Sequence, residues 1–158
     1  FADFSAALES PEAERDRMVS MALLTPEQGA VVDLARVRKF LESPLGKRVL
    51  RSSQVEKERR FTAVVPASLV QPGTGAAQEE IILQGAVDCT FVEEGALHII
   101  DFKTDRVRSM EELWARYETQ LRLYGYAMEE VTGLPVGELI LYSTHLNRES
   151  ARKYKIHS

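Results

Sequence analysis

The first third of the sequence has apolar residues at the intervals of three and four that are typical of helices. The segment Thr25-Pro26-Glu27-Gln28 has a capping Thr, a Pro in the first helical position and a Gln in the third, which together signal a helix start. Ser43-Pro44 is a second start signal, and it precedes another apolar stripe. We therefore expect residues 1–53 to form a helical part, including a weaker helical pattern at 3–24.

After about residue 54 the pattern changes to one of strands. Residues 55–65 are rich in β-branched and charged side chains, and the segments 80–93 and 97–103 are typical of two further strands. The dipeptide Glu94-Gly95 between the last two is a turn signal, so we expect them to form a β-hairpin. The turn-rich residues 71–75 predict a loop.

A long helix is expected after the hairpin. Ser109 and Glu112 have the spacing of a capping box, and the segment Gly133-Leu134-Pro135 is typical of a helix end. A strand at 137–145 and an edge strand at 152–156 would follow. The order of elements predicts one mixed α/β domain over residues 1–158, with a mixed sheet flanked by helices at 54–158.

Composition narrows the class of protein. The chain has 158 residues, of which 44% are hydrophobic and 28% charged, as in soluble globular proteins. It contains no run of 18 apolar residues and no leader pattern, so we expect neither a membrane-spanning helix nor a signal peptide. Its one cysteine, Cys89, excludes an internal disulfide framework and an iron–sulfur cluster ligated wholly by this chain.

The charge is unevenly distributed along the chain. The net charge of −4 alone argues against a nucleic-acid partner. The segment 36–60, however, carries nine basic and three acidic residues. This block, with Arg48 and Arg51, is a candidate for contacts with a polyanion, and a solvated helix face is the alternative interpretation.

Two acidic residues and a lysine are predicted to meet on the hairpin. Asp101 and Lys103 point to the same face of their strand because side chains alternate, and Phe102 points to the other. Asp88 lies on the partner strand and is expected alongside them. Two carboxylates and an ammonium suit the hydrolysis of a phosphodiester. Mg²⁺ prefers hard oxygen ligands, and its remaining ligands are waters and phosphate oxygens of the substrate.

A structural interpretation of the same residues remains open. Asp101 and Lys103 interrupt the end of an apolar run, and burying them would be costly unless they are paired or bound to a metal ion. They are therefore either a site or a buried ion pair. Glu58, on the preceding strand, is either an accessory acidic residue or a surface carboxylate paired with its basic neighbours.

The predicted long helix carries one face of mixed character. Tyr117, Gln120, Leu121 and Tyr124 are spaced at i, i+3, i+4 and i+7, so they share a face. Such a stripe is usually core, but a buried Gln needs a hydrogen-bond partner. Gln120 therefore either satisfies a structural group or reaches a site.

The three motifs together resemble the RecB-like branch of the PD-(D/E)XK nuclease superfamily. The segments that carry the likeness are Gly85-x-x-Asp88, Ile99-Ile100-Asp101-Phe102-Lys103-Thr104-Asp105-Arg106-Val107 and Tyr117-x-x-Gln120-Leu121-x-x-Tyr124. Within this branch, the chain is most similar to the nuclease domains of helicase-nuclease subunits of the AddA type. The likeness extends over residues 18–145 and implies a restriction-endonuclease-like core.

The resemblance also implies roles for individual residues. Asp88, Asp101 and the carbonyl group of Phe102 would bind Mg²⁺, or Mn²⁺ in its place, and Lys103 would be the catalytic lysine. Gln120 would belong to the catalytic set, Tyr124 would support it near DNA, and Glu58 would be accessory. Arg106 would be a DNA contact, together with Arg48 and Arg51.

The sequence departs from the family pattern in its metal-binding histidine. Relatives carry this residue in a Gly-Thr-x-x-His segment on a helix near the start of the domain, and we expect the present chain to begin after it. The four cysteines of AddB-like relatives are also absent, so no iron–sulfur cluster is expected.

The chain has no Gly-x-x-x-x-Gly-Lys-Ser/Thr segment, so ATP would bind only in upstream helicase domains. The resemblance therefore predicts an exonuclease domain in a DNA-repair enzyme of the bacterial cytoplasm, partnered by an AddB-like subunit. The alternative is a nuclease-fold domain that binds DNA or a partner without cutting.

Overall fold

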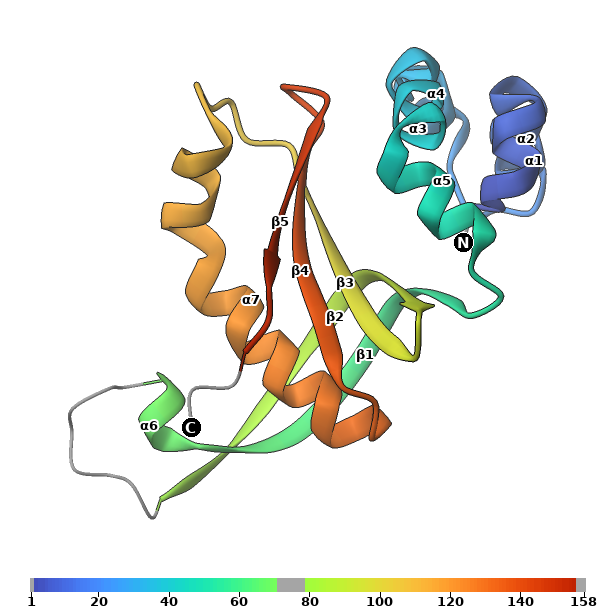
Figure 1. Cartoon of the computed structure of the whole chain (residues 1–158). Helices are drawn as coiled ribbons and strands as arrows, with labels where there is room; N and C mark the ends of the chain where they lie inside the picture. The colour runs from blue at the N-terminus through green and yellow to red at the C-terminus, as the bar shows by residue number, and fades with distance from the viewer. Residues whose placement is uncertain (1, 71–78, 156–158) are drawn as a thin grey trace. The chain divides into compact units, whose positions relative to one another are not determined.

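The chain consists of two compact units, and the boundary between them lies between Ser53 and Gln54. The computed structural model, shown in Figure 1, describes residues 2–70 and 79–155, and each unit is described by itself. The loop expected at 71–75 and the last residue of the expected edge strand, Ile156, lie outside these ranges. Every helix in the described ranges is too short or too polar to cross a lipid bilayer.

The first unit consists of short helices that begin where the capping signals occur. Thr25 and Gln28 form both hydrogen bonds of the predicted capping box, and Ser43 caps the next predicted start through the backbone amide of Gly46. The segment expected to be helical at 3–24 is two helices, because Ser10 caps a new start and Pro11 follows it. The helices are α1 (Phe4–Glu9), α2 (Pro11–Ser20), α3 (Pro26–Val31), α4 (Leu34–Glu42) and α5 (Pro44–Arg51).

The second unit is built on a five-stranded mixed sheet. The strand order is β1-β2-β3-β4-β5, and only the β3–β4 pair is parallel. A parallel pair needs a crossover connection, and the helix α7 provides it (Figure 1). The elements are β1 (Val55–Pro66), α6 (Ala67–Val70), β2 (Glu80–Glu93), β3 (Ala96–Lys103), α7 (Met110–Thr132), β4 (Val136–Ser143) and β5 (Arg148–Lys153). The predicted mixed α/β class is confirmed.

The hairpin between β2 and β3 has the expected two-residue turn. Glu94 and Gly95 both have positive φ angles, 52° and 79°. Two consecutive positive φ values are the feature of a type I′ turn, whose twist matches that of the flanking strands. This turn sets the hairpin register, in which Cys89 lies opposite Ile100.

The long helix α7 begins and ends as predicted, but its start is not a capping box. The Ser109 hydroxyl accepts a hydrogen bond from the Glu112 amide at 3.3 Å. The reciprocal bond is absent, because the Glu112 carboxylate accepts instead from the backbone amide of Arg108 at 2.9 Å. At the other end, Gly133 takes the left-handed conformation with φ 69°, where a side chain would be strained.

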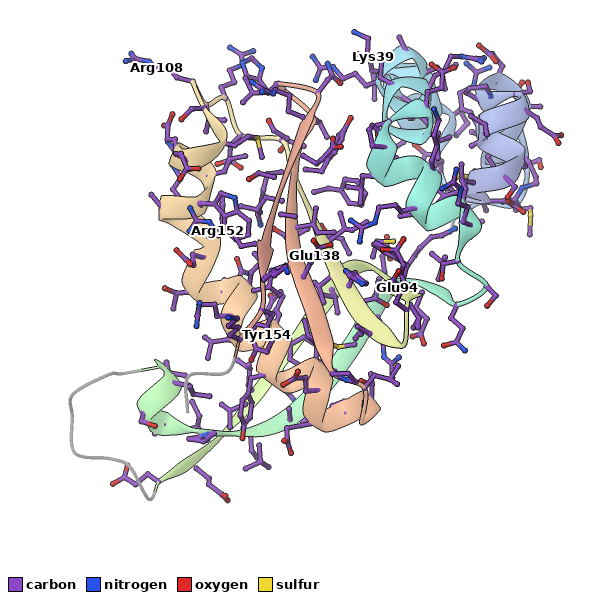
Figure 2. The ribbon with its side chains drawn as sticks, in the orientation of Figure 1. Lys39, Glu94, Arg108, Glu138, Arg152 and Tyr154 are labelled. Atoms are coloured by element: carbon purple, nitrogen blue, oxygen red, sulfur yellow. The ribbon has the colours of Figure 1, made fainter. Side chains whose placement is uncertain are left out.

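The core of the second unit lies between α7 and one face of the sheet. Apolar residues of β1, β2, β3 and β4 pack there against buried residues of α7 that include Leu113, Trp114, Leu121 and Met128. The Trp114 indole also donates a hydrogen bond to the Ser150 hydroxyl at 2.9 Å. Figure 2 shows Arg152 beside α7, where its guanidinium lies 4.5 Å from the centre of the Trp114 ring. These contacts fix β5 to the helix.

Gly85 allows a close approach of two aromatic rings to β2. A Cβ atom at this position would lie 2.7 Å from Cζ of Phe61 and 3.2 Å from Cε1 of Tyr124. These two rings contact each other edge to face, with centroids 5.3 Å apart. Gly85 is therefore required by packing against Phe61 and Tyr124.

The substitution Gly85→Ala is expected to lower the free energy of unfolding by about 1–3 kcal/mol, because the added methyl group overpacks this contact. Denaturant unfolding measures the change. Combining it with Phe61→Leu should cost less than the sum of the two single substitutions, since the smaller side chain makes room. Additive losses would contradict the steric explanation.

Candidate active site

Strands β2 and β3 separate at the predicted site. Their backbone pairing runs from Glu93–Ala96 to Cys89–Ile100 and goes no further. Beyond it, Oδ2 of Asp88 accepts a hydrogen bond from the backbone amide of Phe102 at 2.8 Å. A side-chain carboxylate thus takes the place of a backbone partner, and it brings Asp88 next to the end of β3.

Asp101 is a buried carboxylate at this point, with 5% of its surface exposed. Burial raises the pKa of Asp101, the Lys103 ammonium opposes this rise, and the Asp88 and Asp105 charges add to it. Asp88 is bonded to the backbone amide of the residue that follows Asp101, and Lys103 forms an ion pair with Asp101. The structure therefore brings together Asp88, Asp101 and Lys103.

The contact between Asp101 and Lys103 is a short, buried ion pair. Nζ of Lys103 lies 2.7 Å from Oδ2 of Asp101. Among the described residues, this buried oxygen has no hydrogen-bond partner other than the ammonium. A carboxylate oxygen has more than one lone pair, so Oδ2 of Asp101 can accept a further ligand beside Lys103.

Lys103 is held at both its backbone and its ammonium group. Its carbonyl accepts hydrogen bonds from the amide and the hydroxyl of Thr144, at 2.9 and 3.2 Å. Its ammonium lies 3.9 Å from the centre of the Tyr117 ring. The Tyr117 hydroxyl in turn donates to the Asp105 carboxylate at 3.0 Å, which raises the pKa of Tyr117 and keeps it a donor. The sequence motifs contain Asp105 and Tyr117 but do not reveal this contact.

The donor set fits a hard divalent cation. Two neighbouring carboxylates, Asp88 within β2 and Asp101 near the end of β3, are ligands that Mg²⁺ takes while keeping waters. Within residues 2–70 and 79–155, no cluster of three or more His, Cys, Asp or Glu side chains is arranged to hold a metal ion. The Phe102 carbonyl stays the predicted further ligand.

Gln120 and Tyr124 are hydrogen-bonded to each other. The Gln120 amide donates to the Tyr124 hydroxyl at 2.8 Å, and the Tyr124 ring packs on Phe61. The partner that a half-buried Gln requires is thus a tyrosine one helical turn away, not a carboxylate of the site. The predicted roles of both residues in catalysis stay predictions.

Glu58 lies on β1 across from Asp88. The β1–β2 pairing includes the neighbours on both sides but omits the pair formed by these two residues. Glu58 is exposed and has a positive φ of 50°, which is unusual for a residue with a side chain. The backbone is thus irregular next to the carboxylates, and an accessory role for Glu58 stays a prediction.

The three arginines proposed as DNA contacts lie in different places. Arg48 and Arg51 are in the last turn of α5, in the first unit. Arg106 is exposed in the connection between β3 and α7. Of the three, only Arg106 shares a unit with the carboxylates. His98 lies apart from this set, since it stacks on Phe91 and contacts Glu138.

Comparisons with known proteins bear on this geometry. Residues 2–156 match the PD-(D/E)XK nuclease superfamily. Several relatives are named as A-type subunits of an ATP-dependent helicase/nuclease: one from Acetivibrio thermocellus is 39% identical over 85% of the chain, and one from Carboxydothermus hydrogenoformans is 34% identical over 93%. A third, from Syntrophomonas wolfei, is 38% identical over 89%.

The chain spans only 11–13% of the length of these three relatives. Among solved structures, the crystal structure of SSO0001 matches with a TM-score of 0.44 and 17% identity, over 94% of this chain and 64% of that one.

The available oxygen of Asp101 leads to a prediction about metal binding. Mg²⁺ at about 100 times its dissociation constant should add about 2.7 kcal/mol to the free energy of unfolding, since it binds only the folded chain. Asp101→Asn should abolish this gain. In metal-free buffer the same substitution should leave stability unchanged or higher, because burial disfavours the ionised carboxylate.

Thermal unfolding with and without MgCl₂ measures both effects. Glu130→Gln, which removes an exposed carboxylate of α7, is the matched control and should keep the wild-type response. An equal response to Mg²⁺ in Asp101→Asn would contradict a metal site at Asp101. A large loss of stability of this variant in metal-free buffer would favour a purely structural ion pair.

Proposed function

The chain belongs to the PD-(D/E)XK nuclease superfamily, and from this premise we propose that it hydrolyses phosphodiester bonds of DNA with a divalent cation, Mg²⁺ or Mn²⁺. The observation that carries the proposal is the meeting of Asp88, Asp101 and Lys103 where β2 and β3 separate. An ion pair alone would account for Asp101 and Lys103. It would not account for a second carboxylate, Asp88, beside them.

Each residue has a chemical role in this proposal. Asp88 and Asp101, with the Phe102 carbonyl, would hold the cation. A bound cation supplies a water of lowered pKa and stabilises the charge that grows on the phosphate. Lys103 projects its ammonium toward the same region, where it would orient the attacking water and stabilise negative charge. Gln120 and Tyr124 would support this arrangement from α7.

The relatives indicate a setting for the domain. Because they are named as helicase/nuclease subunits and are far longer than this chain, we place the chain as the nuclease part of such a polypeptide. ATP would be bound by helicase domains elsewhere in it. The proposed setting is an exonuclease that processes DNA breaks for recombinational repair in the bacterial cytoplasm, with an AddB-like partner subunit.

A second candidate function is DNA or partner binding without cleavage. The observation that favours it is the ligand set, since the described residues offer two carboxylates and no cluster of three metal-binding side chains. The metal-binding histidine that the family resemblance predicts has no counterpart on the described helices, since His98 lies on β3 and His145 follows β4. The two candidates differ in one measurable property, which is cleavage in the presence of the cation.

Cleavage is expected to depend on the three converging residues. Asp88→Ala, Asp101→Ala and Lys103→Ala should each lower the rate of Mg²⁺-dependent cleavage of labelled single-stranded DNA by about 100-fold or more. EDTA should abolish cleavage by the unmodified chain. Circular single-stranded DNA should resist, because an exonuclease needs an end.

Glu130→Gln and Lys153→Ala, which change exposed residues of α7 and β5, are the matched controls and should retain activity. Cleavage that survives all three alanine substitutions would sink the catalytic assignment. DNA binding without cleavage by the unmodified chain, with Mg²⁺ or Mn²⁺, would establish the second candidate instead.

The basic block of the first unit leads to a prediction about affinity. Arg48→Glu combined with Arg51→Glu should weaken DNA binding at least 10-fold. It should also reduce the slope of log K against log salt concentration by about 0.7 for each lost phosphate contact with a single strand. Fluorescence anisotropy across a salt series measures both. An unchanged slope would show that α5 does not contact DNA, and Arg15→Glu, a charge reversal on α2 outside the basic block, is the control.

A further inference from the structure

We propose that Tyr117 is a positioning residue whose ring holds the Lys103 ammonium beside Asp101, and that Asp105 fixes this ring. The contacts of the Tyr117 ring do not depend on the domain being a nuclease. The effect of this positioning on catalysis rests on the proposed function, since Lys103 is the lysine of the candidate active site.

A lysine side chain is free to move unless several groups hold it. Its ammonium sits at the end of a flexible four-carbon stem, so one ion pair does not fix its position. Among the described residues, the Lys103 ammonium contacts Asp101 at 2.7 Å and the face of the Tyr117 ring at 3.9 Å from its centre. A cation over an aromatic face is attracted by the negative charge density there.

The contact between Lys103 and the Tyr117 ring matters most when Asp101 also binds a metal cation. A cation bound to the Asp101 carboxylate would compete with Lys103 for the same negative charge. The Tyr117 ring is not a ligand of hard cations, so its attraction for the ammonium persists. Tyr117 would thus keep Lys103 in place when the ion pair with Asp101 is weakened.

The Tyr117 ring is itself held at two ends. It projects from α7, on the face that also carries Gln120 and Tyr124. Its hydroxyl donates to the Asp105 carboxylate, with oxygen distances of 3.0 and 3.2 Å. One end of the ring is therefore anchored by the helix and the other by a carboxylate.

The segment between β3 and α7 holds Asp105 in turn. Asp105 also contacts the Arg116 guanidinium at 3.2 Å, and Arg116 contacts Glu112 on the preceding turn of the helix. Glu112 accepts from the backbone amide of Arg108. This set of contacts ties residues 104–109 to α7 at both ends. Because its ion pairs are partly exposed, we assign it to holding geometry more than to stability.

The closing experiment replaces Tyr117 with phenylalanine and then with phenylalanines carrying one, two and three ring fluorines. These side chains have nearly the same shape, but each fluorine weakens the attraction of the ring for a cation. The turnover rate on single-stranded DNA should fall stepwise, by about 10-fold across the series, while KM for DNA changes less than about 2-fold.

The same series at Tyr126, a tyrosine of α7 outside these contacts, is the matched control and should not change the turnover rate. A flat response at Tyr117 would overturn the proposal, because a ring that serves only for packing is insensitive to fluorination. Equal responses at Tyr117 and Tyr126 would overturn it too.

A second measurement needs neither cleavage nor a metal ion. In the full chain with isotope-labelled lysines, the ε-methylene protons of Lys103 should show an upfield ring-current shift, assigned by comparison with Lys103→Arg. The shift should become smaller in Tyr117→Phe, whose ring loses the contact with Asp105, and disappear in Tyr117→Leu. Its absence from the unmodified chain would overturn the proposal. If the chain never cleaves DNA, the proposed function fails, and this shift still decides whether Tyr117 holds Lys103.

Discussion

The hydrogen bond from the Phe102 amide to the Asp88 carboxylate is the interaction on which the candidate site depends. It forms where backbone pairing between β2 and β3 has ended, so it gives the Phe102 amide a side-chain acceptor in place of a backbone one. The two carboxylates thus approach each other at the point where the strands separate. A sheet that stayed paired to its end would fill this space with backbone.

The charged residues of this region carry a cost in folding stability. Asp101 is buried, and its pKa is raised because burial disfavours its charge. Lys103 offsets part of this cost, and Thr144 and Tyr117 hold the lysine. A buried ion pair is a weak source of stability, since an apolar side chain would pack there at similar or lower cost. Folding alone therefore gives little reason for a carboxylate at position 101.

The features that could be predicted from the sequence are those set by near neighbours in the chain. The helix starts at Thr25 and Ser43, the hairpin turn at Glu94-Gly95 and the helix end at Gly133 all depend on residues within a few positions. The nearness of Asp88 to Asp101 follows from that turn, because a two-residue loop fixes the register. Hydrogen-bond and ring contacts that depend on tertiary packing could not be predicted from the sequence. Glu112 bonds to the Arg108 amide, Gln120 bonds to Tyr124, and Tyr117 lies under Lys103, and each of these choices depends on where α7 rests on the sheet.

The parallel pairing of β3 and β4 has a consequence for how this domain can change over evolution. Parallel strands require a crossover, and here α7 is that crossover and also carries Tyr117, Gln120 and Tyr124. One residue inserted between Tyr117 and Tyr124 would turn the rest of the helix by about 100° and move the two tyrosines to different faces. We therefore expect insertions and deletions to disturb these contacts least outside the helix, and at its start the contacts of Asp105 and Glu112 restrict them again. The spacing of these residues is thus tied to the topology of the sheet.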